Sequence, residues 1–156
     1  MTNFYDPKEI IPGLWIGSQA TSQDPKFMKK NRIELVVNCT RNIPNVMSNV
    51  QYASVPVDDA DDEQKHFLKA VPLALIKMRA AMRRGAGVLV HCYAGISRSS
   101  SVVAAYLIKY HRLSTRDAIL YIKRQKPETF SQGIVFMPAL KHIEKVENGN
   151  AGRSAK

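Results

Sequence analysis

A short apolar segment that runs directly into a loop of small and polar residues limits the folds open to this chain. Residues 88–101 read VLVHCYAGISRSSS, and an amphipathic run continues from Ser99 to Tyr110. An apolar segment without alternation indicates a strand that is covered on both faces. The stretch therefore predicts a buried strand, a tight loop and the N-terminus of a helix, which is the order that builds an α/β fold.

The loop after this strand is suited to binding an anion. The backbone N–H groups of residues 93–98 can point at one centre, and the helix dipole adds about half a positive charge there. The guanidinium of Arg98 can bind two oxygens of a phosphate. The same donors would stabilise a thiolate of Cys92 and so supply a nucleophile at neutral pH. We expect the phosphate to be bound by the loop residues Tyr93, Ala94, Gly95, Ile96, Ser97 and Arg98.

The pattern His91-Cys92-x5-Arg98-Ser99, with small residues inside the loop, resembles the signature loop of the cysteine-dependent protein phosphatases. It is most similar to that of the small dual-specificity phosphatases, and the resemblance extends over residues 10–146. It implies an α/β fold in which a mostly parallel central sheet is flanked by helices on both faces. It also implies an enzyme that removes phosphate from phosphotyrosine and from phosphoserine or phosphothreonine in proteins.

The resemblance assigns roles to the residues of the loop. Cys92 would attack phosphorus and form a cysteinyl-phosphate, which water then hydrolyses. Arg98 and the loop amides would hold the equatorial oxygens, and the hydroxyl of Ser99 would ease departure of the thiolate. His91 would orient the loop rather than act as a base, because it precedes the nucleophile on a strand. No metal or other cofactor is expected.

An acidic stretch, DDADDE over residues 58–63, is expected to supply the proton for the leaving oxygen. An alkoxide is a very poor leaving group, so the reaction needs a general acid. In the family this acid is an aspartate seven residues after an aromatic residue, and Asp59 follows Tyr52 by seven. Asp58 and Asp61 are the alternatives. The stretch also suits the start of a helix, with Asp61 or Asp62 as the N-cap.

A second parallel strand is predicted from Ile33 to Asn38, because Leu35-Val36-Val37 is apolar without alternation. Ligands bind at the carboxyl ends of such strands, and the family carries an asparagine here, which implies that Asn38 braces the phosphate loop. Cys39 lies at the same edge. A reactive thiolate is readily oxidised, so Cys39 is a candidate redox partner of Cys92. The alternative is that Cys39 is a small buried apolar residue.

Turn residues and apolar periodicity predict the other elements of the chain. They indicate an N-terminal arm over residues 1–9, a turn and short strand over 10–18, a short helix capped by Asp24, and an extended segment over 52–57. They further indicate a helix over 63–84 that Pro72 kinks or restarts, helices over 99–110 and 114–126, a last helix to residue 146, and a disordered basic tail over 147–156. The inward residues are expected to be Phe67, Val71, Leu75, Met78 and Met82 on the first long helix, and Ile119, Leu120 and Ile122 on the helix over 114–126.

Composition narrows the setting and the partners. A chain of 156 residues favours a single domain, here over residues 10–146. Two cysteines and an N-terminus without an apolar signal region favour an intracellular, cytoplasmic protein, with a nuclear location also open. No transmembrane segment is predicted. The net charge of +10 attracts phosphorylated proteins and also nucleic acid, of which we favour phosphorylated proteins.

Two other functions use the same loop. An RNA 5′-phosphatase or a phosphoinositide phosphatase fits the positive charge, but residues 93–97 carry no basic side chain. A binding module that holds phosphate without turnover is the second alternative. The presence of Cys92, Arg98 and the acidic stretch argues against such a module, so hydrolysis is the favoured function.

Overall fold

The computed structural model describes residues 5–154, so part of the expected N-terminal arm and the last two residues of the expected tail lie outside the described residues. The strands are β1 (Lys8–Ile11), β2 (Leu14–Gly17), β3 (Ile33–Asn38), β4 (Gln51–Ser54) and β5 (Gly87–His91). The helices are α1 (Gln19–Ser22), α2 (Pro25–Lys30), α3 (Gln64–Arg83), α4 (Arg98–His111), α5 (Thr115–Gln125) and α6 (Met137–Ser154), and a 3₁₀ turn η1 (Asp61–Glu63) precedes α3.

The strands form one mixed sheet in the order β1-β2-β5-β3-β4. β1 and β2 are antiparallel, whereas the other three pairs of neighbours are parallel. Every residue of the central strand β5 is buried, as its unbroken apolar sequence predicted. Because β5 lies between β2 and β3, its last residue His91 pairs with Gly17 on one side and Asn38 on the other. The carboxyl ends of three parallel strands therefore meet where the phosphate loop begins.

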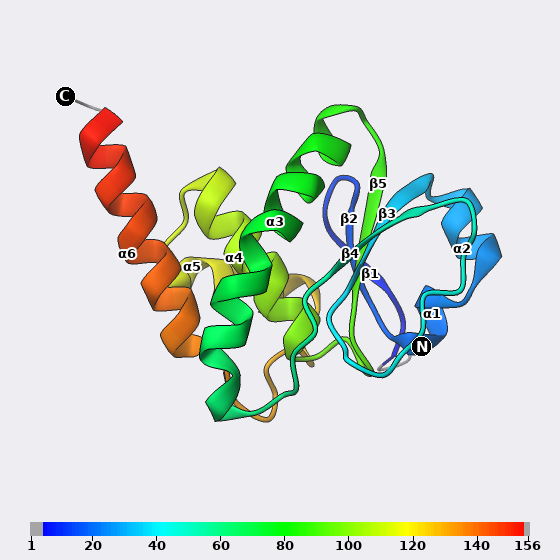
Figure 1. Cartoon of the computed structure of the whole chain (residues 1–156), viewed down its shortest axis with the longest axis horizontal. Helices are drawn as coiled ribbons and strands as arrows, with labels where there is room; N and C mark the ends of the chain where they lie inside the picture. Colours follow the sequence, from blue (N-terminus) through cyan, green and yellow to red (C-terminus); the bar gives the residue numbers. More distant parts are fainter. Residues whose placement is uncertain (1–4, 155–156) are drawn as a thin grey trace.

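Helices cover both faces of this sheet, as predicted (Figure 1). α3, α4, α5 and α6 lie on one side, and α1 and α2 lie on the other. Alternate residues of β3 serve the two layers: Leu35 and Val37 are buried in the larger core, and Val36 is buried in a smaller core with Met28 of α2. The α/β class with a mostly parallel sheet is confirmed.

Two strand boundaries differ from the predictions. Lys8 and Glu9 pair with Ile16 and Trp15 of β2, so the expected arm is wrong for these residues. The chain can fold back there because Gly13 adopts a φ of 87° in the turn. β4 ends at Ser54, short of the extended segment expected to Val57.

The helix over residues 64–83 is continuous and does not restart at Pro72. Val71 and Leu75 are buried in the same core on either side of the proline, and this packing holds the two halves in one helix. Phe67 and Met78 are buried as predicted, and Met82 is half-buried. Neither Asp61 nor Asp62 caps the helix, because these residues form the 3₁₀ turn instead.

The C-terminal helices depart from the predictions in two places. Leu120 is 38% exposed rather than inward, because Ile119 and Ile122 occupy the buried face of α5. α6 continues to Ser154, so the expected disorder is wrong for residues 147–154. A formed helix adds one hydrogen bond for each further residue, and Glu147 and Asn150 also line a groove with Leu75 of α3.

Candidate active site

The phosphate loop, residues 92–98, leaves β5 and enters α4. It turns at Gly95, whose φ is 74° and where an added Cβ would lie 2.8 Å from the backbone oxygen of Gly17. The N–H of Gly95 donates a hydrogen bond to Sγ of Cys92 at 3.3 Å, and the hydroxyl of Ser99 lies 3.2 Å from the same sulfur. The sulfur of the buried Cys92 therefore lies within reach of a backbone N–H and a hydroxyl group.

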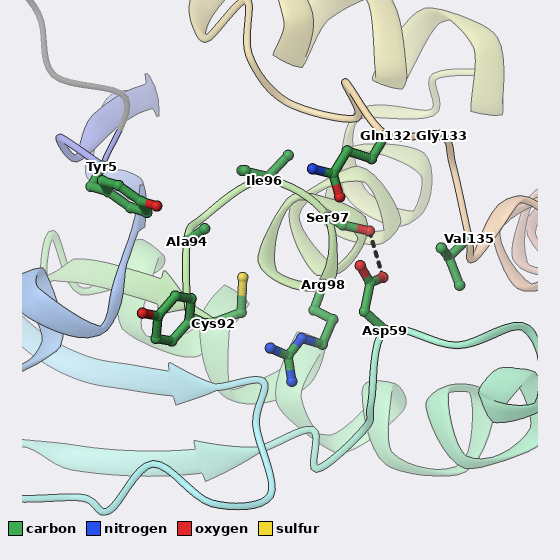
Figure 2. A pocket seen from close by; sticks show the side chains of 11 residues that line it. Tyr5, Asp59, Cys92, Ala94, Ile96, Ser97, Arg98, Gln132, Gly133 and Val135 are labelled. Carbon is green, nitrogen blue, oxygen red and sulfur yellow. Dashed lines mark hydrogen bonds between the residues drawn. The ribbon is translucent and has the colours of Figure 1, made fainter.

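A cavity of about 450 Å³ opens over Cys92 (Figure 2). Its lining residues are Tyr5, Asp59, Cys92, Tyr93, Ala94, Ile96, Ser97, Arg98, Gln132, Gly133 and Val135. The structure thus brings the predicted nucleophile, arginine and acid to one cavity with four of the predicted loop residues. Gly95 and Ser99 contact Cys92 from beneath the loop.

Four lining residues were missed by sequence reasoning. Gln132, Gly133 and Val135 come from the turn between α5 and α6, to which the sequence analysis assigned no role in the site. Tyr5 belongs to the segment that was interpreted as an arm. In Figure 2, Tyr5 lies on one side of the cavity and Val135 on the other. No local pattern in either segment indicates that it reaches the cavity, because this depends on how the chain folds back onto the phosphate loop.

Asp59 is the acidic candidate that lines the cavity. Its Oδ1 accepts a hydrogen bond of 2.8 Å from the hydroxyl of Ser97, drawn as a dashed line in Figure 2. Asp58 points elsewhere, because its Oδ2 lies 3.5 Å from Nε of Arg41. Asp61 lies in the 3₁₀ turn and is not among the lining residues. The geometry favours Asp59 over both alternatives.

Arg98 links the phosphate loop to the acidic stretch. Its Nη1 donates a hydrogen bond of 3.1 Å to the backbone oxygen of Val57. The guanidinium therefore lies between the floor of the cavity and the segment that carries Asp59 (Figure 2). A group in this place can bind phosphate and keep the two loops together.

His91 is buried beneath the loop. Its Nδ1 lies 3.4 Å from the backbone oxygen of Cys92. Burial, and to a smaller extent the charge of Arg98, lowers the pKa of His91 to about 4. An imidazole with this pKa is neutral at physiological pH, and its place behind the nucleophile suits the supporting role expected for it.

The side chain of Asn38 forms its hydrogen bonds with residues 40–45, and its role as a brace of the phosphate loop stays a prediction. Its Nδ2 donates to the backbone oxygen of Ile43 at 2.7 Å and to Oδ1 of Asn45 at 2.9 Å. Its Oδ1 accepts from the N–H and the hydroxyl of Thr40. The chain after β3 folds back over Asn38, so the side-chain amide finds these partners before it reaches residues 93–98.

Cys39 is fully buried beside the site. Both cysteines are free, and the N–H of Cys39 donates to the backbone oxygen of His91 at 2.9 Å. Burial first, and then the neighbouring Cys92, raises the pKa of the Cys39 thiol well above its usual value, with a smaller opposing effect of Arg98. Cys39 is therefore a neutral member of the core. Its role as a redox partner stays a prediction.

Within residues 5–154, which the structure describes, no group of three or more His, Cys, Asp and Glu side chains is placed to hold a metal ion. None of the helices in that range is both long enough and apolar enough to cross a membrane.

A strand, a phosphate-binding loop around a cysteine and an aspartate at the rim are the parts of a cysteine-dependent phosphatase site. Residues 14–146 match the family model for the dual specificity phosphatase catalytic domain, and the chain belongs to this family. The assignment of residues 10–146 to a single catalytic domain stays a prediction.

Individual relatives agree with this membership. The chain is 33% identical to human dual specificity protein phosphatase 9 over 142 residues, which cover 89% of this chain and 36% of that protein. It is 36% identical to Drosophila melanogaster dual specificity protein phosphatase Mpk3 over 144 residues, 88% of this chain and 34% of that one. It thus spans about a third of the length of these curated relatives. A crystal structure of human DUSP28 superposes with a TM-score of 0.82 and 27% identity, covering 90% of this chain and 93% of that one.

Proposed function

We propose that this chain hydrolyses phosphotyrosine and phosphoserine or phosphothreonine in proteins through a cysteinyl-phosphate. The observation that carries the proposal is the environment of Cys92, whose sulfur meets the N–H of Gly95 and the hydroxyl of Ser99 at the floor of a cavity that Asp59 overhangs. The family match and the names of the relatives support the same activity.

In the first step the thiolate of Cys92 attacks phosphorus. The S–P bond forms as the bond from phosphorus to the leaving oxygen breaks, and the protonated carboxyl of Asp59 gives its proton to that oxygen. The loop amides and Arg98 hold the three equatorial oxygens, on which charge is spread in the transition state. The dephosphorylated alcohol or phenol then leaves.

In the second step water attacks the cysteinyl-phosphate. Asp59, now a carboxylate, takes a proton from the water as the S–P bond breaks. The sulfur leaves as a thiolate, and the hydroxyl of Ser99, 3.2 Å away, can donate a hydrogen bond to it. Inorganic phosphate is released, and Asp59 returns to its acid form.

The lining of the cavity favours phosphoproteins over more highly charged substrates. Among the described residues that line it, Arg98 is the one basic side chain. An inositol phosphate or an RNA 5′-triphosphate carries several phosphates and would gain from further cations. Tyr93 at the rim is 60% exposed and offers an aromatic surface to a peptide.

We propose an intracellular, cytoplasmic setting, since both cysteines are free thiols.

The test is a comparison of substrates with two variants of the loop. The parent protein should release phosphate from phosphotyrosine and phosphothreonine peptides faster than from an inositol phospholipid or a 5′-triphosphorylated RNA. Cys92→Ser should abolish turnover yet still bind a phosphopeptide, because only the nucleophile is lost. Arg98→Lys should also lose most activity, because an ammonium cannot form the paired hydrogen bonds of a guanidinium. Turnover by Cys92→Ser, or a preference for lipid or RNA, would contradict the proposal.

A further inference from the structure

We call the three consecutive residues Val57, Asp58 and Asp59 the acid loop. Each of them is held by a hydrogen bond. Arg98 holds the backbone oxygen of Val57 at 3.1 Å, and Ser97 holds the carboxylate of Asp59 at 2.8 Å. The middle residue is held from elsewhere: the N–H of Asp58 donates a hydrogen bond of 2.9 Å to Oε1 of Glu63. The mechanism above gives no role to this third contact.

Glu63 is a buried carboxylate, and both of its oxygens have partners in the structure. Its side chain is only 7% exposed, and Oε1 also accepts a hydrogen bond of 2.6 Å from Nη2 of Arg41. Oε2 pairs with Nδ1 of His66. The hydrogen bond from Arg41 first, then those from the Asp58 N–H and His66, lowers the pKa of Glu63 to about 2. A buried carboxylate with three donors from three segments is costly to move.

Arg41 contacts the acid loop as well as Glu63. Its Nε lies 3.3 Å from Oε1 of Glu63 and 3.5 Å from Oδ2 of Asp58. Arg41 thus draws the Asp58 carboxylate, which is 65% exposed, away from the cavity, while the next residue, Asp59, lines it. Arg41 and Glu63 thus both contact Asp58, the residue next to the aspartate that lines the cavity.

We propose that Glu63 and Arg41 are positioning residues that hold the acid loop so that Asp59 reaches the leaving oxygen. This inference rests on the proposed function. Neither residue lines the cavity; both act through the backbone and side chain of Asp58. A general acid must lie within hydrogen-bond distance of the atom that it protonates, and a misplacement of 1 Å can cost about 100-fold in rate.

The test uses leaving groups that differ in their need for an acid. Glu63→Ala should lower kcat/KM, which reports formation of the cysteinyl-phosphate, for a phosphoserine peptide by about 10–100-fold, because an alkoxide needs the proton. It should lower kcat/KM for an aryl phosphate with an acidic phenol by less than about 3-fold, because that group leaves without one. The affinity for a phosphopeptide should change little, since the phosphate loop is intact. Asp62→Ala, which removes an exposed carboxylate from the same 3₁₀ turn, is the matched control and should behave as the parent.

A double-mutant cycle separates positioning from a general loss of structure. In the Asp59→Asn background, Glu63→Ala should have little further effect on the phosphoserine peptide, because its effect passes through Asp59. Arg41→Ala should show the same dependence on the leaving group, and Arg41→Lys should restore part of the lost rate by pairing with Glu63. If Glu63→Ala does not fold, the two Arg41 variants carry the same test at a site that is 43% exposed.

Three results would overturn the inference: equal losses on both substrates, no loss on either, or a full further loss in the Asp59→Asn background. These results differ from failure of the proposed function. The proposed function is tested by turnover of the aryl phosphate in the parent and by the absence of this turnover in Cys92→Ser. This test does not depend on the general acid, because the aryl group leaves without a proton. A parent that hydrolyses neither substrate would overturn both proposals.

Discussion

Asp58 and Asp59 show how adjacent residues of the same type acquire different partners. The carboxylate of Asp58 is directed to Arg41, whereas that of Asp59 accepts a hydrogen bond from Ser97 inside the phosphate loop. The spacing from Tyr52 favoured Asp59 as the general acid, but Asp58 remained an alternative, because two adjacent aspartates look alike in the sequence. In the folded chain they differ because Asp58 contacts Arg41, 17 residues away, and Asp59 contacts Ser97, 38 residues away.

Asp59→Asn should reduce hydrolysis of a phosphoserine peptide by about 10²–10⁴-fold, the range typical of a lost general acid. It should reduce hydrolysis of an aryl phosphate with a good leaving group far less. Steady-state kinetics on both substrates measure the difference. Asp62→Asn, which neutralises an exposed carboxylate of the 3₁₀ turn, is the matched control, and it should stay within a few-fold of the parent on both. If Asp58→Asn shows the dependence on the leaving group and Asp59→Asn does not, the assignment of the acid is wrong.

The unit of β5, phosphate loop and α4 depends on a close approach to β2. Gly95 has a left-handed backbone conformation and contacts Gly17 at the end of β2, so that its N–H can reach the sulfur of Cys92. The packing of the phosphate loop on β2 thus positions the N–H of Gly95 near Cys92. A side chain at residue 95 would disturb this packing and move the N–H.

Gly95→Ala should lower the free energy of unfolding by about 1–3 kcal/mol, through the unfavourable φ and the contact with the Gly17 oxygen. It should also lower kcat, because the loop must shift. Thermal unfolding and turnover of an aryl phosphate measure the two effects. Gly149→Ala is the control, because Gly149 lies in α6 and an added Cβ there would have no atom within 4 Å. This variant should be neutral or stabilising by up to about 1 kcal/mol. Unchanged activity of Gly95→Ala would show that the close approach does not shape the site.

The stability of the whole molecule should fall in two steps as the pH is lowered. The pKa of His91 falls from 6.5 to about 4 on burial, so its contribution is complete above pH 6.5 and is lost as the pH falls toward 4. The pKa of Glu63 falls from 4.5 to about 2, chiefly through Arg41, so its contribution is complete above pH 4.5 and is lost as the pH falls toward 2.

Urea unfolding between pH 2 and 8 would resolve these two steps. Glu63→Gln should be less stable than the parent by a constant amount above about pH 5, and this gap should narrow as the pH falls from 4.5 toward 2. The upper step should be the same in both proteins, because His91 is unchanged. A gap of equal size at pH 3 and pH 7 would mean that the Glu63 carboxylate does not stabilise the fold.

Local sequence was sufficient wherever the physical cause is local. The strand, loop and helix around Cys92 follow from an apolar run, small residues and an arginine that are contiguous in the chain. The helix starts at Asp24 and Ser114 follow from capping hydrogen bonds to residues two or three positions away. The α/β architecture follows from the order of these elements, because parallel strands are usually joined through helices, as α1 and α2 join β2 to β3 and α3 joins β4 to β5.

Tertiary structure decided what depends on residues far apart in the chain. The hydrogen bonds that join Arg41 to Glu63 and Ser97 to Asp59 cross 22 and 38 residues, and no periodicity encodes them. The partners of Asn38 and the path of residues 132–135 into the cavity also depend on how loops fold back onto the sheet. The sequence alone predicted the candidate nucleophile and the loop around it, because they depend on contiguous residues and local backbone geometry. Only packing determined which carboxylate overhangs that loop and what holds it there, because buried polar groups take the partners that the folded chain brings within reach.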